Sequence, residues 1–173
     1  MKARQSNPPD ATLIRTAEAI DLTKIIEVYG ASVRTLAAPY YSAEQLAAWA
    51  PAAPDFERWR QRLAPLLTIV AIQDGTLAGF ASYEANGHLD FLYTHPAFAR
   101  RGIATHLYQR IEGLLRAAQV PKVFTEASLA ARPFFERQGF QIDGEELVEI
   151  RSARLRRFAM HKTIDHEGES RFG

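Results

Sequence analysis

The sequence has 173 residues, of which 47% are hydrophobic and 24% are charged, and its formal net charge is +1. This length predicts one globular domain with a single core, and a charge so close to zero gives no reason to expect nucleic acid or an anionic membrane as a partner. Cysteine is absent, which excludes disulfides, thiolate metal sites and a cysteine acyl intermediate.

The two ends of the chain are polar. The first ten residues, MKARQSNPPD, lack the apolar stretch of a signal peptide, and no run approaches the ~18 apolar residues that a membrane-spanning helix needs. We therefore expect a cytoplasmic protein that uses neither nucleic acid nor a membrane as a partner. Residues 1–10 and 164–173 are predicted to be flexible tails around one domain, residues 11–163.

The first third of the chain predicts a strand followed by helices. Residues 12–17 have the composition of a strand, and Asp21 then fits the N-cap of an amphipathic helix. Ser42 and Gln45 have the spacing of a capping box, which predicts a second helix. A further helical piece covers residues 55–63.

The middle and end of the chain predict mainly strands. Alternating apolar residues with Asp74-Gly75 and Asn86-Gly87 as type I′ turns predict an antiparallel meander. Its strands are residues 67–72, 77–84 and 88–94; they are followed by a helix at 102–119, a strand at 122–127, a short helix at 131–138 and strands at 146–151 and 155–162. The predicted order is β-α-α-β-β-β-α-β-α-β-β, an α+β domain around one mixed, mostly antiparallel sheet flanked by helices.

One segment, LYTHPAFARRGIATHLYQRIEGLLR, places Arg100, Arg101 and Gly102 at the start of the long helix. The first turn of a helix has N–H groups without intrahelical partners and a positive dipole end, so it favours an anion such as phosphate. Glycine lets the anion approach the backbone. Taken alone, the pattern also fits a turn followed by a solvated helix start.

This segment resembles the acyl-CoA-binding motif of the GNAT superfamily of N-acetyltransferases, in which a strand and turn lead to Q/R-x-x-G-x-G/A at a helix start. A second segment, EASLAARPFFERQGF, is similar to the family's N-x-x-A…LYEKxGF motif, and the order of elements matches over about residues 14–162. The stretches YSAEQLAAWA and RRFAMHK further resemble the YafP-like branch of the superfamily.

The resemblance implies a GNAT fold and the transfer of an acetyl group from acetyl-CoA to a primary amine, by direct attack in a ternary complex and without a metal. It favours a small-molecule acceptor over a protein. It also implies that the strand before the motif splays from the next strand, and that three sets of residues bind CoA. These are Arg100, Arg101, Gly102, Ile103, Ala104 and Thr105 at the pyrophosphate, Leu92, Tyr93 and Thr94 along the pantetheine arm, and Ser128 where the family has Asn.

Three positions depart from the family pattern. Ala99 replaces the first Gln or Arg of the motif, Ser128 replaces the Asn, and Phe135 replaces the Tyr that often serves as general acid. Phenylalanine cannot donate a proton, which leaves a non-catalytic acyl-CoA-binding or sensing domain as the alternative function. A thiolate with a pKa near ~8.5 is nevertheless a tolerable leaving group without a dedicated acid.

Three carboxylates are candidates for the base that the reaction needs, because an amine with a pKa of ~10.4 is almost wholly protonated at neutral pH. Asp90 is favoured, since desolvation within an apolar strand would increase its basicity. The alternative is a structural acid that is ion-paired or hydrogen-bonded to Tyr83. Glu84 and Glu126 are the other candidates, against the alternative of solvated acids or, for Glu126, a helix cap.

The predicted hairpin determines which side chains share a face of the sheet. A two-residue turn at residues 86–87 pairs Tyr83 with Asp90. These two side chains would then share a face with His88, which is expected to be exposed beside the turn.

The acceptor site is expected outside the cofactor motifs. Tyr40, Tyr41 and Trp49 form an aromatic group that could line a substrate pocket, although helix core is the alternative. The segment RSARLRRF carries four arginines, which could bind an anionic substrate or nucleic acid or could simply be a solvated strand face. The sequence leaves open whether the protein is a monomer or a homodimer.

Overall fold

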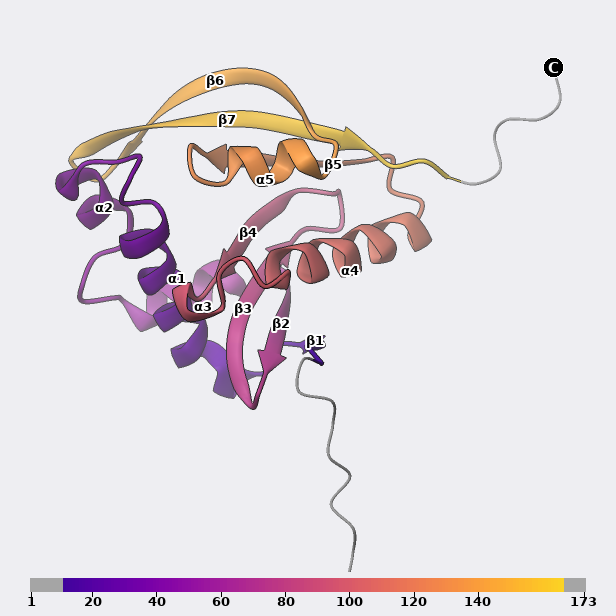
Figure 1. Cartoon of the computed structure of the whole chain (residues 1–173), viewed down its shortest axis with the longest axis horizontal. Coiled ribbons are helices and arrows are strands. Elements are labelled where there is room, and N and C mark those ends of the chain that lie inside the picture. Colours follow the sequence, from indigo (N-terminus) through magenta and orange to yellow (C-terminus); the bar gives the residue numbers. More distant parts are fainter. Residues whose placement is uncertain (1–10, 167–173) are drawn as a thin grey trace, which may run out of the picture.

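The computed structural model describes residues 11–166 (Figure 1). The predicted tail at residues 1–10 and most of the one at 164–173 lie outside the described residues. Ile164 is described, however, and is only 2% exposed, with its amide donating to Pro121 O at 2.9 Å. The packed domain therefore extends at least one residue beyond the predicted boundary at 163.

The described residues form seven strands, five α-helices and two short 3-10 helices. In chain order they are β1 (Leu13–Thr16), η1 (Ala19–Asp21), α1 (Leu22–Leu36), α2 (Ala43–Trp49), α3 (Phe56–Leu63), β2 (Leu67–Gln73), β3 (Thr76–Tyr83), β4 (Leu89–Thr94), η2 (Pro96–Phe98), α4 (Ile103–Ala117), β5 (Lys122–Ser128), α5 (Arg132–Arg137), β6 (Gln141–Ile150) and β7 (Ala153–Thr163). The predicted α+β fold is confirmed, and the helical piece predicted at residues 55–63 is α3, a third helix between β1 and β2 that the predicted order did not count.

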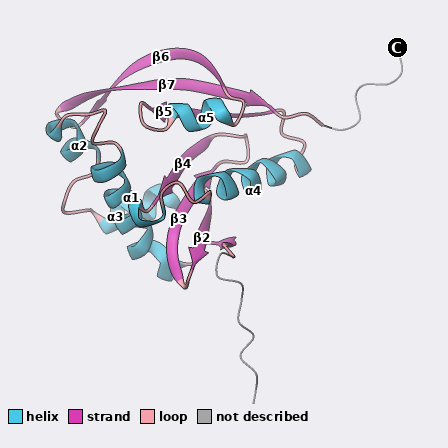
Figure 2. Cartoon of the chain, in the orientation of Figure 1, coloured by secondary structure: helices cyan, strands magenta, loops and turns pink. Residues whose placement is uncertain are grey.

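The strands form two sheets rather than the single mixed sheet that was predicted (Figure 2). One has the order β1-β2-β3-β4 and the other β5-β7-β6, and all the ladders in them are antiparallel. The start of β4 and the loop before it meet β5 through a parallel bridge between His88 and Phe124, a hydrogen bond of 3.0 Å from Phe124 N to Gly87 O and one of 2.8 Å from Thr125 Oγ1 to Leu89 O. The sheets diverge beyond this junction, which leaves one edge of β4 without a neighbouring strand in the described chain.

Helices cover both faces of the four-stranded sheet (Figures 1 and 2). On one face, α4 buries Leu107 and Ile111 in a core that continues through β5 and α5 to β7. On the other face, α1 buries Ile25 and Val28 against β2, β3 and β4. A smaller cluster joins α2 to the end of the β6–β7 hairpin. The core thus holds the two sheets together on the α4 side and leaves the α1 side of the junction open.

The predicted capping box at Ser42 is confirmed. Ser42 Oγ accepts a hydrogen bond from Gln45 N at 3.2 Å, and Ser42 N donates to Gln45 Oε1 at 2.8 Å. Gln45 Nε2 also donates to Arg154 O at 2.8 Å, which ties the start of α2 to β7. Asp21 precedes α1 as predicted but does not cap it, because its carboxylate binds the guanidinium of Arg15 at 2.7 and 2.9 Å.

The two predicted hairpin turns differ in outcome. Asp74 and Gly75 both have positive φ, 52° and 75°, as a type I′ turn requires. The prediction of a two-residue type I′ turn at Asn86-Gly87 is wrong. Glu84 N donates to His88 O at 2.9 Å, and this hydrogen bond closes a three-residue loop, 85–87. Gly87 takes the left-handed position of that loop, with φ 98°.

This longer loop shifts the register of the hairpin. Tyr83 pairs with Leu89, Ser82 pairs with Phe91, and Asp90 is the extra residue of a bulge between them. The prediction that Tyr83 and Asp90 share a face is therefore wrong. Tyr83 packs with Leu89 in the core beneath α4, whereas Asp90 lies on the side of α3.

Candidate functional site

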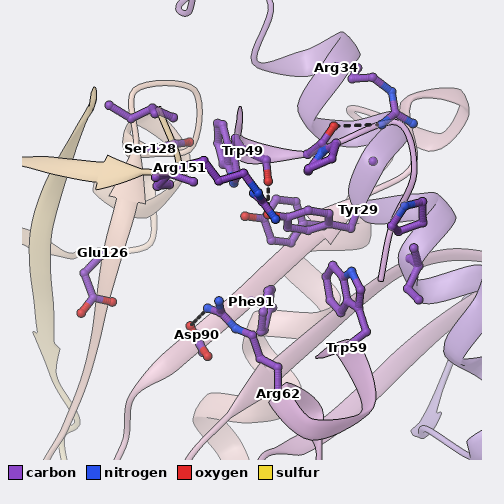
Figure 3. A pocket seen from close by; sticks show the side chains of 18 of the residues that line it. Tyr29, Arg34, Trp49, Trp59, Arg62, Asp90, Phe91, Glu126, Ser128 and Arg151 are labelled. Atoms are coloured by element: carbon purple, nitrogen blue, oxygen red, sulfur yellow. Dashed lines mark hydrogen bonds and ion pairs between the residues drawn. The ribbon is translucent and has the colours of Figure 1, made fainter. Parts of the chain in front are cut away.

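A cleft of about 870 Å³ lies where the two sheets separate (Figure 3). Its walls come from α1, the end of α2 and the loop after it, α3, β4, β5, α5 and the β6–β7 hairpin. Segments far apart in the sequence therefore meet here. The volume falls within the ~300–1,000 Å³ that is usual for small-molecule sites.

Aromatic side chains line part of the cleft. Tyr29 lies edge-on to Trp59 and Tyr93, with ring centroids 4.7 and 4.8 Å away, and Phe91 is 5.6 Å from Trp59. Burial raises the pKa of Tyr29 to about 12, although nearby arginines act in the opposite sense. Its hydroxyl is therefore a neutral hydrogen-bonding group at physiological pH rather than an anion.

Asp90, the favoured base in the sequence, is engaged by another side chain. Its carboxylate lies 3.3 Å from the guanidinium of Arg62, which also lies 4.8 Å from the centroid of the Phe91 ring. Asp90 lines the cleft, and its side chain is 23% exposed. The structure thus agrees with the ion-paired alternative for Asp90 and not with a hydrogen bond to Tyr83.

Glu84 and Glu126, the other candidate bases, are joined through His88. The Nδ1 of His88 lies 2.8 Å from Glu84 Oε2 and its Nε2 lies 2.7 Å from Glu126 Oε2. The imidazole ring stacks on Phe124 with centroids 5.0 Å apart, and its side chain is only 18% exposed. The expectation that His88 is exposed is wrong, because the register shift and the bridge to β5 bring it between the two carboxylates.

The two carboxylates change the protonation of this histidine. Burial acts to lower the pKa of His88, but hydrogen bonds to Glu126 and Glu84 outweigh it and raise that pKa above its ordinary value. When protonated, both ring nitrogens are donors, which matches two acceptors on opposite sides of the ring. Glu126 lines the cleft, so the chain Glu126–His88–Glu84 leads from the cleft to the hairpin turn.

The residues predicted to hold a pyrophosphate, 100–105, do not line the cleft. They form the N-terminal end of α4 and the turn before it, which we call the mouth of α4. Arg100 and Gly102 have left-handed backbone, with φ 61° and 81°. The first main-chain bond of the helix runs from His106 N to Gly102 O at 2.9 Å, so the N–H groups of Ile103, Ala104 and Thr105 precede it. A Cβ built on Gly102 would meet only His106 Cε1, 3.8 Å away. Open space beside several main-chain donors suits a phosphate group.

The cleft and this mouth meet along β4. Leu92 and Tyr93 line the cleft, whereas Thr94, one residue nearer to α4, does not. Ser128, across the gap on β5, also lines the cleft, and its hydroxyl accepts a hydrogen bond from Ala131 N at 3.1 Å. Phe135 lines the same part and is 3% exposed.

The three aromatic residues predicted for the acceptor pocket separate in the structure. Trp49 and Tyr41 line the cleft, but Tyr40 does not and is 51% exposed. The hydroxyl of Tyr41 donates to Arg156 O at 2.7 Å and accepts from Leu129 N at 2.9 Å. Tyr41 thus connects the start of α2 with β7 and the end of β5. Tyr108, on α4, is a core residue at 1% exposure.

The four arginines of the β6–β7 hairpin also differ in where their side chains lie. Arg154, Arg156 and Arg157 face Glu149, Glu145 and Glu146 on β6 at 3.6, 2.7 and 2.8 Å, as a solvated strand face would. Arg151, the first residue of the two-residue turn between β6 and β7, instead reaches across to Ala48 O. Its φ of 52° is uncommon for a residue with a long side chain and costs about 1 kcal/mol.

A second arginine of the cleft lining comes from α1. Arg34 on α1 donates to Ala50 O at 3.4 Å. Its guanidinium lies over Gly30, where a Cβ would come within 2.7 Å of the guanidinium nitrogens. Glycine inside a helix costs about 1 kcal/mol relative to alanine, and here it makes room for Arg34.

Sequence reasoning missed several cleft residues: Tyr29, Arg34, Trp59, Arg62 and His88. For Arg34 a signal existed, since Gly30 interrupts a helical pattern and Arg34 follows four residues later on the same face. For Arg62 and His88 no local pattern identifies the partner, because each pairs with a residue 28 or 38 positions away.

Within residues 11–166, no helix is long and apolar enough to span a membrane. In the same range, no three His, Asp or Glu side chains are grouped so as to hold a metal ion.

Known proteins share both sequence and fold with this chain. A family model described as an acetyltransferase (GNAT) domain matches residues 37–163. The uncharacterized N-acetyltransferase YafP of Escherichia coli (strain K12) is 32% identical over 153 residues, which cover 88% of this chain and 97% of that protein. The crystal structure of the "GCN5-Related N-acetyltransferase: Aminotransferase, Class-II" from Rhodopseudomonas palustris is 31% identical, with a TM-score of 0.85 over 91% of this chain and 99% of that one. The PaiA N-acetyltransferase from Thermoplasma acidophilum, solved in complex with coenzyme A, shares the fold, with a TM-score of 0.69 at 23% identity over 88% and 99% of the two chains.

Proposed function

This chain belongs to the GNAT acetyltransferase family, and on that premise we propose that it transfers an acetyl group from acetyl-CoA to a primary amine by direct attack. The observation that carries the proposal is the meeting of two regions along β4, an anion-accepting helix mouth at one end and a cleft at the other. The volume of the cleft supports a small-molecule acceptor over a protein.

The cofactor residues are those at the α4 mouth and along the unpaired edge of β4. Main-chain N–H groups from Arg101 to Thr105 would hold the pyrophosphate, with Arg100 and Arg101 adding positive charge. Leu92, Tyr93 and Thr94 would offer main-chain groups to the pantetheine arm, as an added strand would use them. When bound there, acetyl-CoA supplies the thioester that reacts with the amine.

Glu126 is the base in this proposal, with His88 and Glu84 behind it. Its carboxylate lines the cleft, and its contact within the described chain is a histidine that can pass a proton on. Asp90 lines the cleft as well, but its partner Arg62 keeps its protons and offers no onward path for one, whereas His88 also contacts Glu84. Glu126 would take the proton of the incoming ammonium, and Glu84 would connect the pair to solvent.

No tyrosine assists the leaving thiolate in this mechanism. Phe135 is apolar, and the hydroxyl of Tyr108 is buried in the core. Because a thiol has a pKa of about 8.5, its thiolate leaves without a dedicated acid at neutral pH. The non-catalytic alternative rests on the same Phe135.

Release of free thiol from acetyl-CoA tests the proposal. The full chain is incubated with acetyl-CoA and a panel of primary amines, and the thiol is followed with a chromogenic disulfide. Amine-dependent release with stoichiometric acetylated amine is expected. Calorimetric binding of acetyl-CoA without release in the presence of any amine would support the sensing alternative, and absence of both would contradict either function.

A further inference from the structure

The acidic side chains that line the cleft have hydrogen-bonding or ionic partners, whereas several of its arginines have no carboxylate partner among the described residues. Its arginines are Arg34, Arg58, Arg62, Arg151, Arg156 and Arg157, and its acids are Glu27, Asp55, Asp90, Glu126 and Glu149. Each acid already has a partner: Lys24 for Glu27, Arg58 N for Asp55, Arg62 for Asp90, His88 for Glu126 and Arg154 for Glu149. Among residues 11–166, no carboxylate lies within 4 Å of the guanidinium of Arg34, Arg58 or Arg151.

Two of these three guanidinium groups are held in place by main chain. Arg34 binds Ala50 O and Arg151 binds Ala48 O, two carbonyls at the C-terminal end of α2. A guanidinium has five N–H donors, so a single carbonyl leaves most of them available. Both guanidinium groups are therefore held on the cleft wall while most of their N–H groups remain available. Such an arrangement suits the binding of an anion.

The backbone of Arg151 is unusual, because it has left-handed φ at a turn position where Gly, Asn or Asp would be relaxed. The guanidinium of Arg34 lies over Gly30, in space that a larger residue there would share. A solvated surface arginine needs neither arrangement. Strained or costly backbone that serves only to aim a side chain is a feature of functional sites.

The surroundings of Arg151 match an acceptor with an apolar body. The positive charges of Arg151 and Arg62 both act on the Tyr29 hydroxyl, so these guanidinium groups lie close to the aromatic wall. In Figure 3, Arg151 extends toward Tyr29, while Arg62 turns to Asp90 on another side of the cleft. An anion held by Arg151 would place its attached apolar group against Tyr29 and Trp59.

We propose that the acceptor amine carries an anionic group, a carboxylate or a phosphate, which binds Arg151 and Arg34. This inference rests on the proposed acetyl transfer and adds the class of substrate. The remaining part of the acceptor contacts the aromatic wall, and its amine is left to face Glu126. A charge-assisted hydrogen bond of this kind changes affinity by about tenfold to a hundredfold.

Matched pairs of amines test the proposal. L-phenylalanine and phenethylamine share an aromatic ring and a primary amine and differ by a carboxylate. Aminoethyl phosphate and ethanolamine differ by a phosphate. We expect the anionic member of at least one pair to have a kcat/KM about tenfold to a hundredfold higher, mainly through KM, and the pair that shows this identifies the anion. Equal or better use of the neutral members would overturn the proposal while leaving acetyl transfer intact.

Two variants locate the effect. Arg151→Asn removes the guanidinium but suits left-handed backbone, so the protein should fold, and Arg34→Gln removes the second guanidinium, which comes from α1. Each should lower kcat/KM for the anionic amine far more than for its neutral partner, so that the preference for the anion is lost. Arg154→Gln, on the same hairpin but outside the cleft, is the control and should keep the preference. An equal loss for both members of a pair in Arg151→Asn and Arg34→Gln would show that the arginines only support the fold.

A binding measurement separates this inference from the proposed reaction. The four amines are titrated calorimetrically into the full chain saturated with CoA. If no amine accepts an acetyl group, the proposed function fails, yet tighter binding of the anionic members that is lost in Arg151→Asn would still establish the anion site. Indistinguishable heats for the members of both pairs would refute the site.

Discussion

The mouth of α4, the proposed CoA site, and the cleft, the proposed acceptor site, are built from different parts of the chain. At the mouth, the main-chain N–H groups of residues 103–105 precede the first hydrogen bond of α4, and a Cβ on Gly102 beside them would meet only His106. In the cleft, side chains from eight helices and strands converge, and hydrogen bonds between distant residues hold several of them, such as Arg151 on Ala48 O. The mouth thus offers mainly main-chain groups to a ligand, whereas the cleft offers mainly side chains.

This difference has a chemical consequence. A backbone site recognises a group through geometry that most sequences can form, so it fits a cosubstrate that many related proteins share. A side-chain site depends on which residues stand on each wall, so it can differ between relatives that keep one fold. Substitutions that leave the backbone alone should therefore matter little at the mouth and much in the cleft.

The largest expected effect is at the mouth, where a side chain is added and not removed. Gly102→Glu places a carboxylate and a Cβ where phosphate would bind, and like charges in contact cost several kcal/mol, so CoA affinity should fall by about a thousandfold. Calorimetry with CoA measures it. Gly113→Glu makes the same change later in α4, where a Cβ meets nothing within 4 Å, and should bind normally.

Removal of a side chain at the mouth provides the complementary test. Arg101→Gln keeps every main-chain donor and should weaken CoA binding by less than about tenfold, the size of one exposed charge contact. A loss as large as that of Gly102→Glu would contradict the main-chain account of this site.

The next effect concerns the base. Glu126→Gln should lower kcat by about a hundredfold or more with little change in acetyl-CoA binding, because a general base contributes at least that much. Asp90→Asn should lower kcat far less, since Asp90 is tied to Arg62. Steady-state kinetics of both variants decide between them.

Glu149→Gln is the matched control for this pair, because Glu149 lines the cleft but pairs with Arg154 on β7. It should retain the wild-type kcat. If Asp90→Asn instead shows the larger loss and a shifted pH profile, the base is Asp90 and not Glu126.

The same contrast explains what the sequence could predict. The mouth lies within one segment, so the strand, the turn and the start of α4 followed from local patterns, as did the capping box at Ser42. The cleft depends on register and long-range contacts. A single extra residue in the loop at 85–87 moved Asp90 to another face and brought His88 between Glu84 and Glu126, and no local rule chose that loop over the two-residue turn.

A smaller effect is expected for the contact that joins α2 to both strands of the cleft wall. Tyr41→Phe removes a buried hydroxyl that bonds Arg156 O and Leu129 N, and it leaves both main-chain groups without that partner. The free energy of unfolding should fall by about 1–3 kcal/mol, measured by urea denaturation. Tyr40→Phe, at the exposed neighbouring position, should leave it unchanged, and equal stabilities of the two variants would contradict this role of Tyr41.

The smallest expected effect is the pH dependence that His88 gives to the junction of the sheets. Because Glu126 and Glu84 raise its pKa in the folded protein above the ordinary 6.5, the protonated form favours folding. This stabilisation is complete below the unfolded pKa and is lost as the pH rises through the folded pKa. The partly exposed site should keep it below about 1 kcal/mol.

Urea denaturation of the wild type and His88→Gln at about pH 6 and about pH 8 measures this contribution. The difference in unfolding free energy should be larger at the lower pH. His106→Gln, which changes an exposed histidine on α4, is the control for titration of other groups and should show no such trend. A difference that stays constant with pH would contradict the raised pKa that Glu126 and Glu84 give to His88 in the folded protein.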